Sequence, residues 1–154
     1  MILGLDEKKV TELTVDLNEL LANFQVFYQN LRGLHWNIRG KQFFELHVKF
    51  EEFYTDAQEK VDMIAERILT LQGTPLHTFA DYTNESSIPA GKNISKDIEA
   101  VQLIVDSLEV LLKIERKILD KSDKADDEGT NSLMSDFISE QEKTVWMLKA
   151  WLGN

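Results

Sequence analysis

Four residues whose side chains commonly bind metal ions are spread over a short part of the chain. His47 follows His35 by 12 residues, Asp62 follows His47 by 15, and Glu66 follows Asp62 by 4. Two imidazoles and two carboxylates, without a thiolate, suit a borderline divalent metal such as Fe(II), and open coordination positions would admit an oxidant. The set therefore predicts a site at which a metal ion is bound and oxidised.

The spacing prevents these residues from meeting within one chain. His47, Asp62 and Glu66 belong to one predicted helix, and a rise of about 1.5 Å per residue places His47 roughly 22 Å from Asp62. The two carboxylates lie one turn apart, so both can reach one cation, and they point away from the apolar stripe of that helix. We therefore expect the histidines of one subunit to face the carboxylates of another.

Each residue also has an ordinary structural explanation. Carboxylates spaced by four residues occur on any solvated helix. His35 follows an apolar seam and precedes Trp36, which is typical of a hydrogen-bonded histidine at a helix end, and His47 can be an interface residue without metal. His77 follows Pro75 in an irregular segment and is expected to be a loop residue. The metal hypothesis therefore rests on the set of four.

The elements that must position these residues follow from the apolar pattern, which has helical spacing in four stretches. The first stripe ends before Arg39-Gly40, and Gly73 and Pro75 end the second. Strand signals are lacking throughout. The four stripes run over residues 10–34, 43–71, 98–119 and 133–152.

The connections between these helices are short, long and short. Residues 73–93 form an irregular crossover in which 78–82 can make one short helix. Ser95 is predicted to open the third helix, a polar loop is predicted over 121–129, and Thr130 is predicted to cap the last helix. This order predicts an all-α, ferritin-like four-helix bundle whose long crossover contains a short helix.

Composition limits the remaining possibilities. The 154 residues are 43% hydrophobic and are expected to form one domain, 1–154. Cysteine is absent, which excludes thiolate ligands and is compatible with a cytoplasmic protein. We expect no signal peptide, because the apolar run 1–5 is too short, and no membrane span. The net charge of −10 favours cations over nucleic acid as partners.

The usual ferritin-like metal site is not encoded. Such a site inside the bundle needs a glutamate three residues before a histidine on facing helices. No glutamate stands three residues before His35, His47 or His77. An intra-bundle di-iron site is therefore predicted to be absent, which leaves the site shared between subunits.

The run LHWNIRGKQFFELHVKFEEFYTDAQEKVDMIAERI, from Leu34 to Ile68, resembles the ferroxidase signature of the Dps family, the mini-ferritins known as DNA-binding proteins from starved cells. The ending EKTVWMLKAWL, from Glu142 to Leu152, is also similar. The resemblance implies that His35 and His47 of one subunit and Asp62 and Glu66 of its two-fold neighbour bind iron, and it allows two ions per site.

The resemblance also implies a function. Members assemble as a hollow dodecamer, oxidise Fe(II) with hydrogen peroxide in preference to dioxygen, and store ferric mineral inside, which protects the cell from oxidative damage. Trp36 resembles a tryptophan beside the iron site and would accept oxidising equivalents there, or would simply pack at the subunit contact. The expected activity is that of a ferroxidase.

Two further surfaces are implied. Iron enters the family's shells through acidic three-fold pores near the start of the last helix, where the candidates are Asp127, Glu128 and Asp136; Ser132 replaces a frequent aspartate. Glu51 and Glu52 would line the cavity and nucleate mineral, or would form a solvated helix face.

Direct DNA binding is not expected. DNA-binding members commonly use a lysine-rich tail, whereas the amino terminus here has Lys8 and Lys9 beside Asp6 and Glu7. The acidic surface would repel phosphate. A nucleoid-compacting protein and a non-catalytic structural oligomer remain the alternative functions.

Overall fold

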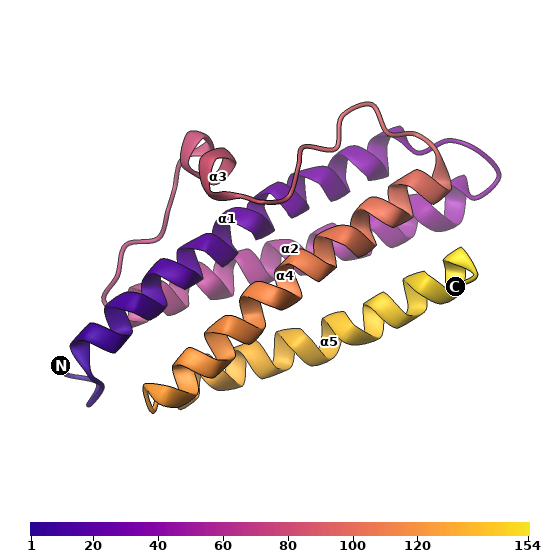
Figure 1. Ribbon diagram of the computed structural model, residues 1–154. Coiled ribbons are helices and arrows are strands. Elements are labelled where there is room, and N and C mark those ends of the chain that lie inside the picture. The colour runs from indigo at the N-terminus through magenta and orange to yellow at the C-terminus, as the bar shows by residue number, and fades with distance from the viewer.

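The computed structural model describes residues Met1–Asn154, which form five helices joined by loops. The four long helices lie along one another as two hairpins, α1 with α2 and α4 with α5, and a long crossover carrying α3 leads from one hairpin to the other (Figure 1). The predicted all-α bundle with a long crossover is confirmed. The helices are α1 Glu7–Asn37, α2 Phe43–Thr70, α3 Phe79–Glu85, α4 Asp97–Lys124 and α5 Glu128–Leu152.

The apolar stripes of the four long helices meet in one core. Phe24 of α1 lies at its centre, with its ring edge-on to Phe27 at 6.3 Å and to Phe137 of α5 at 6.0 Å between centroids. Phe50 of α2 and Leu111 of α4 are completely buried in the same cluster. Burial of these side chains is the main stabilising contribution to the bundle. None of the helices combines the length and the apolar character needed to cross a membrane.

Two predicted helix starts are wrong. Lys96, rather than Ser95, occupies the cap position of α4, and the Ser95 carbonyl instead accepts the backbone N–H of Arg39 at 2.9 Å. Asp127, rather than Thr130, caps α5, because its carboxylate accepts the backbone N–H of Thr130 at 3.1 Å. α4 also continues to Lys124, so residues 121–124 of the predicted 121–129 loop are helical.

The crossover is held to α1 by asparagine side chains. Asn30 donates to the carbonyl of Pro89 at 2.9 Å and accepts the N–H of Gly91 at 2.8 Å. Asn18 forms the same kind of pair with Thr74 and Leu76. These bonds satisfy backbone N–H and C=O groups of the crossover that have no partner within a helix. The short helix, predicted over 78–82, is capped by Thr78 and extends to Glu85.

Candidate metal site

The hairpin of α1 and α2 brings the two histidines together. His35 is in the last turn of α1 and His47 is in the second turn of α2. Their rings stack with centroids 3.8 Å apart and planes 11° from parallel. The intervening loop turns at Gly40, whose φ of +116° is a conformation that favours glycine. The 12-residue spacing therefore produces a histidine pair.

Reciprocal hydrogen bonds select one tautomer of both rings. Nδ1 of His35 lies 2.5 Å from the backbone carbonyl oxygen of His47, and Nδ1 of His47 lies 2.8 Å from that of His35. A carbonyl oxygen only accepts, so each Nδ1 carries the proton and donates it. In the neutral imidazole, this tautomer leaves the lone pair of each Nε2 free, which is the form of histidine that binds metals.

Three neighbours complete the surroundings of the pair. Phe43 stacks on His47 with centroids 4.9 Å apart and planes 18° from parallel. A carboxylate oxygen of Glu51 lies 3.7 Å from Nε2 of His35, and the ring of Tyr54 stands edge-on to His35 at 5.4 Å. The sequence prediction did not include Tyr54, and it placed Glu51 only among candidate cavity acids. The signal for Glu51 was its position one helical turn after His47.

Tyr54 keeps its phenolic hydrogen at neutral pH. Its hydroxyl donates to Oε1 of Glu51 at 3.4 Å. Loss of solvent contact raises the pKa of Tyr54, and the charge of Glu51 and the hydrogen bond to it raise the pKa further. An intact O–H group therefore lies beside the histidine pair.

Asp62 and Glu66 lie farther along α2 and do not reach the histidines of their own chain. Both are exposed, and neither side chain forms a hydrogen bond or ion pair within the chain. No cluster of three or more possible metal-binding side chains exists in a single chain. Any site that uses all four predicted residues therefore needs a second chain.

The outer face of α2 has the character of an interface. At about 100° per residue, Phe44, Val48 and Leu69 point within roughly 40° of the direction of Asp62. All three apolar side chains are more than half exposed, and Phe44 is 81% exposed. Trp36, at the end of α1, is also exposed, with a guanidinium group lying over its ring. Apolar side chains among carboxylates are typical of a surface that binds a protein partner.

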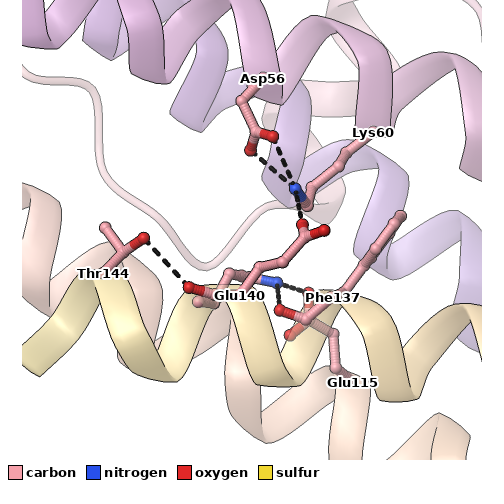
Figure 2. Close-up of polar contacts among 7 residues, drawn as sticks. Asp56, Lys60, Glu115, Phe137, Glu140 and Thr144 are labelled. Atoms are coloured by element: carbon pink, nitrogen blue, oxygen red, sulfur yellow. Dashed lines mark hydrogen bonds and ion pairs between the residues drawn. The ribbon is translucent and has the colours of Figure 1, made fainter.

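Between α2 and α5, an ammonium group occupies the space among carboxylates (Figure 2). Lys60 is only 4% exposed, and its Nζ donates to Asp56 and Glu140 at 2.7 Å each. Burial alone lowers the pKa of Lys60, but the hydrogen bonds to the two carboxylates outweigh it and raise the pKa. This fixed positive charge opposes metal binding inside the bundle, which agrees with the missing Glu-x-x-His pattern.

Beside this cluster, Glu115 of α4 is completely buried. Its Oε2 accepts a hydrogen bond from Nε2 of Gln141 at 2.6 Å, whereas Oε1 of Glu115 and Oε1 of Gln141 have no partner (Figure 2). Burial raises the pKa of Glu115 to about 8. The carboxyl is therefore protonated at neutral pH and has a hydrogen to donate, rather than a charge for a metal.

One of the three candidate pore acids is buried. Asp127 is 2% exposed and accepts a hydrogen bond from Nη2 of Arg67 at 2.7 Å while it caps α5. A Cβ on Gly129 would lie 2.7 Å from the same Nη2, so the lack of a side chain there makes room for the guanidinium. Asp127 is therefore a structural residue, whereas the other two candidates, Glu128 and Asp136, are exposed.

The other residues named from the sequence lie on the surface. Glu52 is exposed and pairs with Lys49 at 2.7 Å. Ser132 is exposed near the start of α5. His77 lies in the crossover, where its Nδ1 is 3.0 Å from the carbonyl of Pro75. The prediction that His77 is a loop residue is confirmed.

Comparisons with known proteins show the family to which the chain belongs. Residues 15–154 match the Ferritin family model, described as a ferritin-like domain. The DNA protection during starvation protein of Porphyromonas gingivalis is 41% identical over 150 residues, which cover 97% of this chain and 94% of that protein. The corresponding protein of Brevibacillus brevis is 39% identical over 140 residues, which cover 91% of this chain and 94% of that protein.

A solved structure has nearly the same fold. The crystal structure of a Dps protein from Vibrio cholerae O1, described as a member of a broad superfamily of ferritin-like diiron-carboxylate proteins, superposes with a TM-score of 0.97 and 51% identity, covering 99% of this chain and 96% of that one. The predicted ferritin-like fold is confirmed. The chain thus belongs to the Dps family of ferritin-like proteins.

Proposed function

We propose that this protein is a ferroxidase and iron-storing mini-ferritin that oxidises Fe(II), preferably with hydrogen peroxide, at sites shared between two subunits. The observation that supports it best is the stacked pair of His35 and His47, in which both Nδ1 atoms donate to carbonyls and both Nε2 lone pairs are free. Membership of the Dps family supports the choice of iron.

The proposed site combines residues of two chains. His35 and His47 of one subunit provide neutral nitrogen donors, while Asp62 and Glu66 of the two-fold neighbour provide oxygen donors. Their negative charges favour Fe(III) over Fe(II), because the attraction grows with the charge of the ion. With two ions bound, each Fe(II) gives one electron to peroxide, the O–O bond breaks, and two hydroxide ions form without a free radical.

The proposed assembly uses the outer face of α2. Phe44, Val48 and Leu69 are exposed on the face that carries the two carboxylates. A second copy that buries them would bring its Asp62 and Glu66 to a histidine pair. Trp36 belongs to this contact in our proposal. Twelve copies would form the hollow shell that stores ferric mineral, with Glu128 and Asp136 near its entrances.

The test uses subunit complementation. Purified shells receive Fe(II) anaerobically and then peroxide, and ferric absorbance is followed. We expect His35→Ala and Asp62→Asn each to abolish rapid oxidation, while His77→Ala keeps the normal rate. Co-expression of the two inactive chains should restore part of the rate, since a mixed dimer contains one intact site.

Unchanged oxidation in both single variants would instead favour a non-catalytic structural oligomer. Loss of activity without recovery in the mixed shells would mean that all ligands come from one chain. Nucleoid compaction is the second candidate, favoured by the name of the Porphyromonas gingivalis relative and opposed by the net charge of −10.

A further inference from the structure

The ammonium of Lys60 occupies a position whose surroundings all favour a cation. Three carboxylate oxygens lie within 2.9 Å of its Nζ, two from Asp56 of α2 and one from Glu140 of α5 (Figure 2). The ring of Phe137 adds a face that attracts positive charge, with Nζ 5.3 Å from its centroid. Lys60 itself is buried, so these protein groups replace most of the water that an ammonium would otherwise bind.

Two further oxygens beside this position have no partner. Oε1 of Glu115 and Oε1 of Gln141 are buried and form no hydrogen bond. Burial raises the pKa of Glu115, and the charge of Lys60 opposes that rise, so the charge acts on the buried carboxyl. The interior therefore has spare oxygen atoms close enough to interact with a cation held at the position of Nζ.

Lys60 balances only part of the charge at this position. Asp56 and Glu140 carry two negative charges, and the ammonium supplies one positive charge. A divalent metal ion would neutralise both carboxylates, and oxygen ligands suit hard ions such as Mn(II). The two carboxylate side chains are 56% and 62% exposed, so they can move closer to an ion that arrives from solvent. The position could therefore accept a divalent ion if the ammonium were absent.

We propose that Lys60 is a specificity-determining residue, whose ammonium fills a cation position between α2 and α5 that would otherwise take a divalent metal ion. Because the ammonium is attached to the chain, its effective concentration at this position exceeds that of a free ion. In the natural protein Lys60 therefore keeps the position closed to metal. Its effect is to confine Fe(II) to the site shared between subunits, and this part of the inference rests on the proposed function.

The experiment removes the ammonium and counts bound metal ions. The purified full-length protein is titrated with Mn(II) alone, and free Mn(II) is measured by electron paramagnetic resonance. We expect Lys60→Met, which has a neutral side chain of similar length, to bind one more Mn(II) per chain than the natural protein. Lys60→Arg keeps the charge and should bind no additional ion. Lys113→Met frees only Glu109 on the surface of α4 and should also bind none.

Second substitutions identify the ligands. In the Lys60→Met background, Asp56→Asn and Glu140→Gln should each remove the additional ion. We expect Lys60→Met to fold, because the two carboxylates that lose their partner are exposed and can be hydrated. Its melting temperature and native mass check this. If Lys60→Met does not fold, Lys60→Gln provides the same test with a neutral polar side chain.

Equal Mn(II) counts in the natural protein and in a folded neutral variant of Lys60 would overturn the inference. An additional ion that persists after Asp56→Asn or Glu140→Gln would also overturn it. In either case, histidine-dependent oxidation of Fe(II) would leave the ferroxidase function standing. If instead the additional ion binds and the natural protein shows no such oxidation, the cation position stands and the role of Lys60 in directing iron is rejected.

Discussion

The buried carboxyl of Glu115 should make stability depend on pH. Its pKa is about 8 in the folded chain and near 4.5 when solvated, so the folded state holds this proton more tightly. Its stabilising contribution is therefore complete below about pH 4.5 and is lost as pH rises through 8. In that window the free energy of unfolding should fall by up to about 1.4 kcal/mol per pH unit.

Glu115→Gln removes the titrating group while placing an amide of nearly the same shape next to Gln141. We expect its denaturant midpoint to fall less steeply between pH 5 and 8 than that of the natural protein, measured by guanidinium unfolding at several pH values. Parallel pH profiles for the two proteins would mean that Glu115 does not carry the proton.

Some residues of the candidate site could be predicted from the sequence and others could not. His35 and His47 could be found because histidine is a common metal ligand and both belong to a recognisable spacing. Tyr54 could not be found in this way, because a tyrosine in an amphipathic helix is typical of a packed core position. Only the hairpin of α1 and α2 shows that its ring lies against His35. The protonation of Nδ1 likewise needed the positions of two backbone carbonyls.

Among the elements, the crossover depends on α1 for its hydrogen bonds. Asn30→Ala should destabilise the fold by about 1–3 kcal/mol, because the N–H of Gly91 and the carbonyl of Pro89 lose their partner. Thermal unfolding followed by circular dichroism measures the change. Gln29→Ala, at the exposed neighbouring position, is the control and should leave the melting temperature nearly unchanged. Equal shifts in the two variants would contradict this role of Asn30.

Helix existence was predictable, but helix starts depended on distant partners. The spacing of apolar residues predicted the four long helices correctly, because apolar residues recur on the face of each helix that is buried. Asp127 and Thr130 are both good caps by residue type. Arg67 of α2 contacts both residues: it donates to the Thr130 hydroxyl at 2.9 Å, and its ion pair with Asp127 at 2.7 Å holds that carboxylate at the start of α5. No local pattern contains that contact.

For the whole molecule, assembly and activity should fail together. Phe44→Asp places a charge in the proposed two-fold contact, so we expect native mass spectrometry to show smaller species and Fe(II) oxidation to be lost although the histidine pair is intact. Ile98→Asp adds the same charge at an exposed position on α4 and serves as the comparison. A Phe44→Asp shell of full mass and normal rate would exclude this face as the contact.

The net charge leads to a second prediction at this scale. Twelve copies would carry a charge of roughly −120, which repels the phosphates of DNA. We expect no shift of duplex DNA by micromolar shells in a low-salt gel without divalent cations. A retarded complex under those conditions would contradict the prediction. The charge of one chain can be counted from the sequence, whereas the twelve copies are part of our proposal.

The reciprocal bonds of His35 and His47 have a consequence for how the site fails. Each imidazole is oriented by a backbone carbonyl of the other histidine, so both rings are already held in place without an ion. Metal binding should therefore cost little side-chain conformational entropy. Substitution of one histidine removes its ring but keeps its backbone carbonyl, so the other imidazole is still oriented by its hydrogen bond. Damage to one histidine should therefore cost less affinity than damage to both.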